Sequence, residues 1–143
     1  MSVEYLLDHS AWIRSDVDSL PDSRALEFGD DYEAGRLAVC LPFMLEAGVS
    51  ARSGRDHAEL TEELLTLPFI PINEEVERRA LDAQAQLARA AHHRMPPVDV
   101  LIAAIADCHG LGVLHYDHDY DILSEKTDLD FYSQWLMPRG TLN

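Results

Sequence analysis

Short apolar runs alternate along the chain with longer segments that have helical patterns. The runs are continuous, as expected for strands that are buried on both faces of a parallel sheet. They span residues 3–7, 37–41, 69–72 and 113–114. The longer segments repeat apolar residues near the helical period or begin at residues that favour a first helical turn. They span residues 24–34, 42–51, 56–65, 73–91 and 98–109.

This alternation predicts an α/β domain with a mostly parallel sheet of four to five short strands. No repeat, low-complexity tract or linker divides the chain, so residues 1–143 are expected to form a single domain. No stretch reaches the ~18 apolar residues that a membrane span needs, and the N-terminus lacks the layout of a signal peptide. We therefore expect a cytoplasmic protein, in which Cys40 and Cys108 are buried reduced thiols.

The charge balance limits which partners the chain can bind. Its 143 residues include 11 Lys and Arg against 26 Asp and Glu, which gives a net charge of −15. Such a chain is poorly suited to hold a polyanion by its own charge. Binding of nucleic acid would need positive charge from bound metal ions or from a few clustered arginines.

Four acidic residues stand at unusual places in this pattern. Asp8 directly follows the first apolar run, and Asp117 follows the last one after two residues. Glu46 and Asp99 are embedded in apolar helical segments, where a carboxylate is costly unless it is paired or bound to a cation. Each has an ordinary explanation as a helix cap, a partner of the helix dipole or half of an ion pair.

Taken together, the four acids indicate a metal site. Residues at strand ends and in first helical turns can converge in one crevice of a parallel sheet, where close carboxylates repel one another without a counter-ion. Oxygen ligands alone favour Mg²⁺ or Mn²⁺. Such a site can activate a water molecule and stabilise the negative charge that develops when a phosphodiester is hydrolysed.

Four segments also resemble, in order, the acidic motifs of PIN-domain proteins. They are residues 5–13, 42–46, 98–104 and 115–121, and the closing segment 134–141 resembles the tail of VapC-type toxins. The resemblance implies a three-layer α/β/α sandwich and a metal-dependent endoribonuclease. It further implies a homodimeric toxin that a cognate antitoxin neutralises.

The same resemblance assigns roles to individual residues. Asp8, Glu46, Asp99 and Asp117 would form the catalytic, metal-binding quartet, with Asp119 as an auxiliary ligand and Ser10 as a hydrogen-bonding support for Asp8. The family usually has a small hydroxylated residue directly after the first aspartate, whereas this chain has His9. The role of that histidine is left open.

Basic and apolar residues give further expectations for partners. Arg52 and Arg55 follow the Glu46 segment and are candidates for holding RNA phosphates, although an ordinary surface arginine is the simpler explanation for each. The early helices carry more apolar positions than one layer needs, so some of them could form a partner groove or a dimer seam. A basic antitoxin would suit this acidic chain, and one of its arginines could occupy the carboxylate cluster.

Alternatives remain beside the ribonuclease interpretation. One is a non-catalytic PIN-like module that binds a basic partner peptide, and another is cleavage of DNA. Residues 117–128 begin like an EF-hand loop but have Ile122 where the loop needs glycine. The adjacent His92 and His93 lack the spacing of a structural zinc site.

Overall fold

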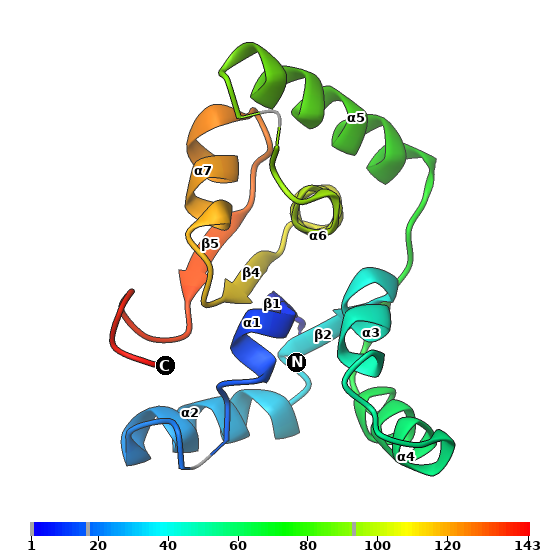
Figure 1. Ribbon diagram of the computed structural model, residues 1–143, viewed down its shortest axis with the longest axis vertical. Helices are drawn as coiled ribbons and strands as arrows, with labels where there is room; N and C mark the ends of the chain where they lie inside the picture. The colour runs from blue at the N-terminus through cyan, green and yellow to red at the C-terminus, as the bar shows by residue number, and fades with distance from the viewer. Residues whose placement is uncertain (1, 17, 93) are drawn as a thin grey trace.

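A five-stranded sheet runs through the centre of the computed structural model, which describes residues 2–16, 18–92 and 94–143 (Figure 1). In their order across the sheet the strands are β3 (Phe69–Ile70), β2 (Leu37–Cys40), β1 (Tyr5–Leu7), β4 (Gly112–His115) and β5 (Tyr132–Trp135). Every neighbouring pair is parallel. The predicted parallel sheet is therefore confirmed: three of the four apolar runs each contain one strand, and the run at residues 113–114 lies within β4.

Helices cover both faces of the sheet. They are α1 (His9–Trp12), α2 (Asp22–Glu33), α3 (Leu41–Gly48), α4 (Gly54–Leu64), α5 (Glu74–Arg89), α6 (Pro97–His109) and α7 (Asp119–Lys126). Figure 1 shows α5, α6 and α7 on one side of the strands and α2 and α4 on the other. The expected three-layer α/β/α sandwich is thus confirmed. No helix within the described ranges is long and apolar enough to cross a membrane.

Local sequence signals explain where the long helices begin and end. The side chain of Asn73 accepts a hydrogen bond from the backbone N–H of Val76 at 2.9 Å and so caps α5. Pro97 opens α6, where its missing N–H has no helical partner to lose. Gly110 ends α6 with φ 67°, a left-handed conformation that glycine adopts without strain.

The strand order creates a crevice at the carboxyl ends of β1 and β4. The chain adds β2 and β3 on one side of β1, and it adds β4 and β5 on the other side. Ligands of open parallel sheets bind at such a switch point. The backbone N–H of Asp8 donates to the carbonyl of Leu114 at 3.0 Å, so the ends of the two central strands are tied together at this point.

The elements that follow β4 were not located from the sequence. Sequence patterns placed no element after residue 114, whereas the structure has α7 and β5 there. Helix α7 is short and acidic at its start, and β5 is an edge strand whose residues are exposed or half-buried. For this reason neither element has the apolar pattern by which the other helices and strands were located. Both cysteines are free thiols, with Cys40 fully buried and Cys108 half-buried.

Candidate metal centre

Asp8 is held rigidly at the carboxyl end of β1. It caps α1, and its Oδ2 atom accepts hydrogen bonds from both the backbone N–H and the hydroxyl of Ser10. The Ser10 hydroxyl oxygen in turn accepts a hydrogen bond from the backbone N–H of Tyr116 at 2.8 Å. Ser10 therefore links the first acidic segment to the chain that follows β4. The Asp8 side chain is buried by this arrangement.

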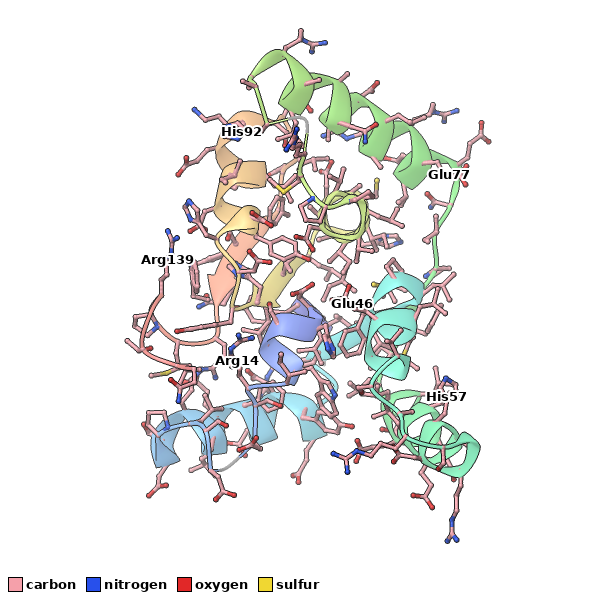
Figure 2. All side chains as sticks on the ribbon, viewed as in Figure 1. Arg14, Glu46, His57, Glu77, His92 and Arg139 are labelled. Atoms are coloured by element: carbon pink, nitrogen blue, oxygen red, sulfur yellow. The ribbon has the colours of Figure 1, made fainter. Side chains whose placement is uncertain are left out.

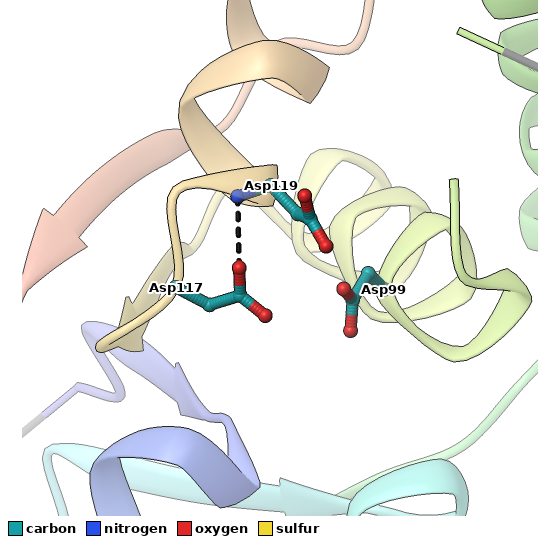
Figure 3. A group of neighbouring side chains, drawn as sticks. All are labelled: Asp99, Asp117 and Asp119. Carbon is teal, nitrogen blue, oxygen red and sulfur yellow. Dashed lines mark hydrogen bonds between the residues drawn. The ribbon is translucent and has the colours of Figure 1, made fainter. Parts of the chain in front are cut away.

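Asp99, Asp117 and Asp119 form a compact group of carboxylates (Figure 3). Each offers one oxygen atom, and these atoms all lie within 4.8 Å of one another. Asp99 comes from the first turn of α6, while Asp117 and Asp119 lie at the start of α7. The backbone N–H of Asp119 donates to Asp117 Oδ1 at 2.9 Å, which fixes the two neighbours relative to each other.

The remaining acids, Asp8 and Glu46, interact electrostatically with this group. Burial is the largest cause that raises the pKa of Asp99 to about 8, and four further carboxylates act in the same direction. Those four belong to Asp8, Asp117, Asp119 and Glu46. Burial also raises the pKa of Glu46, and the charge of Asp8 adds to that effect. Figure 2 shows Glu46 on α3, on the side of that helix where α1 lies.

No basic side chain that the structure describes neutralises these carboxylates. Among the residues that the structure describes, no Lys, Arg or His nitrogen lies within 4.0 Å of an oxygen of any of the five acids. His9 is close enough to Glu46 for its charge to lower the pKa of that carboxyl, against the larger effect of burial. The negative charge of the cluster therefore calls for a cation from outside the chain.

The donor set fits a hard divalent cation. The three grouped ligand atoms are all carboxylate oxygens, and in the described part of the chain no other set of three His, Cys, Asp or Glu ligand atoms lies this close together. Oxygen donors match Mg²⁺ and Mn²⁺, which retain water molecules and bind phosphate oxygens. The zinc alternative gains no support from His92, and His93 lies outside the described residues.

A buried histidine supports the main chain at Asp117. His115 is fully buried, and its Nδ1 atom accepts a hydrogen bond from the backbone N–H of Asp117 at 3.1 Å. Its Nε2 atom therefore carries the proton and donates to the Ser133 hydroxyl at 2.8 Å, which donates to Asp121 Oδ1 at 2.8 Å. Burial lowers the pKa of His115 to about 4, so the ring is neutral. No pattern in the sequence pointed to a role for these residues.

The two candidate phosphate-binding arginines lie elsewhere. Arg55 is exposed in the first turn of α4 and pairs with Glu59 at 3.1 Å. Arg52, just before α4, donates its backbone N–H to Asp56 Oδ2 at 2.9 Å. Figure 1 shows α4 at the opposite end of the molecule from α7. The structure thus brings neither arginine into the carboxylate group, and their contact with RNA stays a prediction.

Comparisons with known proteins agree on one family. The family model described as "PIN domain" matches residues 5–126. Ribonuclease VapC51 of Mycobacterium tuberculosis is 36% identical over 143 residues, which cover 100% of both chains. Ribonuclease VapC18 of the same organism is 38% identical over 112 residues, which cover 76% of this chain and 80% of that protein.

Solved structures agree with the fold. The DNA-bound VapBC complex from Salmonella typhimurium contains a chain that matches with a TM-score of 0.73 at 18% identity, covering 94% of this chain and 99% of that one. A chain of VapBC2 from Rickettsia felis, bound to a DNA fragment from its promoter, matches with a TM-score of 0.71 at 14% identity. That match also covers 94% of this chain and 99% of the other. At these identities the likeness concerns the fold alone.

Proposed function

The chain belongs to the PIN-domain family, and we propose on this basis that it is an endoribonuclease toxin of the VapC type that a cognate antitoxin neutralises. Relatives that match it over its whole length are named ribonucleases, and the VapBC name of the solved neighbours fits a toxin-antitoxin pair. The observation that carries the proposal is the group formed by Asp99, Asp117 and Asp119, whose charge no side chain of the described residues neutralises. We place the activity in the cytoplasm, where RNA is available.

Mg²⁺ or Mn²⁺ is the proposed cofactor. Asp99 and Asp117 would hold it, with Asp8, Glu46 and Asp119 completing the binding site directly or by orienting bound water. When bound, the ion supplies positive charge that attracts the scissile phosphate and lowers the pKa of a water molecule. A bound cation would explain how a chain with a net charge of −15 can bind RNA, because the cation makes the crevice attractive to a polyanion.

The chain's own residues contribute position and a fixed pattern of charge. Ser10 fixes the Asp8 carboxylate, and His115 fixes the main chain at Asp117, so the acids need no rearrangement when the cation and the substrate arrive. Burial of Asp99 also excludes water from one side of the crevice. Negative charge that develops on the phosphate would therefore interact with the site in surroundings of low dielectric constant, where electrostatic interactions are stronger.

Exposed apolar residues in α3 and at its C-cap support a homodimer. Leu45 is 64% exposed and Val49 is 85% exposed, and they line a groove of about 380 Å³ together with Glu46. Helix α3 carries a single charged residue, Glu46. Two copies that each carry −15 repel one another, so this charge-poor face is where they can meet, and we assign it to a second copy of the chain. Such a dimer would place the two carboxylate clusters beside one interface.

A different face suits the antitoxin. The early helices carry more apolar positions than one layer needs, and the structure leaves Ile13 51% exposed and Leu26 68% exposed. Ile13 lies at the end of α1 and Leu26 lies on α2, which carries five acidic residues among its twelve. An antitoxin segment with apolar and basic residues complements this face. An arginine from the same partner could replace the cation among the carboxylates.

RNA cleavage with end mapping tests the proposed function. Purified protein is incubated with a mixture of structured and single-stranded RNA in millimolar Mg²⁺ or Mn²⁺, and the 5′ ends of the products are sequenced. We expect cleavage that chelation with EDTA abolishes and that Asp99→Asn reduces by at least about 100-fold, because both remove the cation-binding charge. Intact RNA in both metals would overturn the nuclease proposal, and the non-catalytic module that binds a basic peptide would take its place.

A further inference from the structure

A tyrosine hydroxyl lies beneath the carboxylates, between the first and third acidic segments. Tyr120 is fully buried on α7, and its hydroxyl donates a hydrogen bond to Asp8 Oδ1 at 2.6 Å. The same hydroxyl oxygen lies 3.4 Å from Asp99 Oδ1. One side chain of α7 thus contacts carboxylates that come from the end of β1 and from the start of α6.

The packing of the Tyr120 ring does not explain why this side chain carries a hydroxyl group. The Tyr120 ring stacks on His115 with centroids 4.9 Å apart, and it meets Phe131 edge to face at 6.4 Å. A phenyl ring would make the same contacts. A buried hydroxyl is costly unless it is paired, and the partners of this one are the two carboxylates. The hydroxyl is therefore accounted for by Asp8 and Asp99.

The hydrogen bond completes the support of Asp8. Ser10 holds Oδ2 through its backbone N–H and its hydroxyl, and Tyr120 holds Oδ1. With both oxygens anchored, the carboxylate cannot rotate about its last bond without losing a hydrogen bond. A carboxylate oxygen has two lone pairs, so Oδ1 keeps one that is free for another ligand.

We propose that Tyr120 is a positioning residue of the metal centre, whose hydroxyl holds the Asp8 carboxylate beside that of Asp99 so that both can bind one cation. The inference rests on the proposed function, because it concerns the cation that the function requires. Hydrogen-bond partners of metal ligands set the orientation of those ligands, and their loss typically weakens metal binding about 10- to 100-fold. Tyr120 has no exposed surface, so the proposed role is to orient Asp8 and not to touch the substrate.

The test is Tyr120→Phe in the full chain, with Mn²⁺ as the probe. Mn²⁺ binding is measured by calorimetric titration, and RNA cleavage is followed across a Mn²⁺ series. We expect the Mn²⁺ concentration for half-maximal binding and for half-maximal cleavage to rise about 10- to 100-fold, with much of the cleavage rate recovered at saturating Mn²⁺. An unchanged Mn²⁺ dependence would overturn the inference.

Two control variants separate positioning from packing. Tyr32→Phe also removes a tyrosine hydroxyl, but Tyr32 packs against Trp12 and Phe28 at the α2 layer. Phe131→Leu disturbs the packing of the Tyr120 ring and leaves the hydroxyl in place. We expect both to keep the wild-type Mn²⁺ dependence, whatever their melting temperatures. A shift in Phe131→Leu equal to that in Tyr120→Phe would show that packing alone is responsible and would contradict the inference.

Wild-type measurements distinguish the two levels of failure. If the wild-type chain neither binds Mn²⁺ nor cleaves RNA, the proposed function fails first. If it does both and Tyr120→Phe is indistinguishable from it, only the positioning role fails. Should Tyr120→Phe not fold, ¹⁹F NMR of the 3-fluorotyrosine-labelled wild-type chain gives the answer, because Tyr120 is the one fully buried tyrosine. Its resonance must shift on saturation with Mg²⁺, and an unmoved resonance would overturn the inference.

Discussion

The backbone N–H of Asp117 donates a hydrogen bond to Nδ1 of His115, two residues earlier in the chain. This contact turns a buried imidazole into an acceptor for the main chain of a candidate metal ligand. It also requires the proton to sit on Nε2, which donates to Ser133 on the edge strand. The carboxyl end of β4 is thus fixed by a side chain of β5, and the candidate metal centre depends on the outermost strand.

Removing the Ser133 hydroxyl should weaken the fold and the site together. In Ser133→Ala the buried Nε2–H of His115 loses its acceptor, which we expect to lower the free energy of unfolding by about 1–3 kcal/mol. RNA cleavage should also fall because Asp117 is less firmly held. Urea unfolding and cleavage assays measure the two effects. Ser50→Ala is the matched control, since the exposed Ser50 hydroxyl bonds only to the Ala47 carbonyl, and a loss of similar size there would refute the prediction.

Asp99 should make the metal-free protein less stable as the pH rises. Its pKa is raised to about 8 in the folded chain, whereas the carboxyl has its ordinary pKa of 3.8 when unfolded. The folded state therefore binds more protons between these values, so its stability falls from about pH 4 to pH 8 and then levels off. Asp99→Asn removes this part of the pH dependence. Urea unfolding of both proteins at pH 5 and pH 8 measures it, and equal differences in the two proteins would show that Asp99 does not titrate in this way.

Metal binding should also depend on the protonation of Asp99, but it should strengthen as the pH rises. A cation competes with the proton on Asp99, so the apparent affinity for Mn²⁺ should increase as the pH rises toward 8. Saturating Mg²⁺ should likewise raise the melting temperature more at pH 8 than at pH 5. Titration calorimetry at several pH values tests this, and a constant Mn²⁺ affinity across that range would argue against Asp99 as a ligand.

A charge on the apolar face of α3 should dissociate the proposed dimer. Leu45→Glu places a carboxylate at the centre of the groove, where a second copy would bury it beside its own acidic surface. Light scattering after size exclusion should report a dimer for the wild type and a monomer for this variant. Leu26→Glu, on the α2 face, should leave the dimer intact and weaken antitoxin binding instead. A monomeric wild-type chain at high micromolar concentration would contradict the assignment.

The two exposed arginines test whether RNA extends along α4. If Arg52 and Arg55 bind phosphates, each alanine variant should weaken RNA binding uniformly across sequences and reduce the salt slope by about 1. The stability of the protein should change by less than about 0.5 kcal/mol, because the pair between Arg55 and Glu59 is exposed. Unchanged affinity and salt slope would leave both arginines as ordinary surface residues.

Sequence patterns predicted the central strands because these strands are buried on both faces. A strand such as Leu37–Cys40 must be apolar at every position, and that requirement leaves a continuous run in the sequence. The Asn73 cap was likewise visible because a cap is a local signal. Helix α7 and strand β5 escaped detection because their burial depends on neighbours that are distant in sequence.

The residues of the candidate site could likewise be predicted only in part from the sequence. Asp8, Glu46, Asp99 and Asp117 were singled out because carboxylates are out of place in apolar segments and at strand ends, and Asp119 followed from the family resemblance. The residues that support them left no such signal. Tyr120 and Asp8 are separated by 112 positions, and a tyrosine on a helix looks like an ordinary core residue until the fold brings the two together.

Titration of the purified chain with Mn²⁺ determines whether these carboxylates share a cation. The number of bound ions is read from the electron paramagnetic resonance signal of free Mn²⁺. We expect at least one bound ion per chain at millimolar Mn²⁺ or below, and loss of that ion in Asp99→Asn. Wild-type protein that leaves all the Mn²⁺ free, or an Asp99→Asn variant that binds it equally well, would show that these carboxylates do not form a shared cation site.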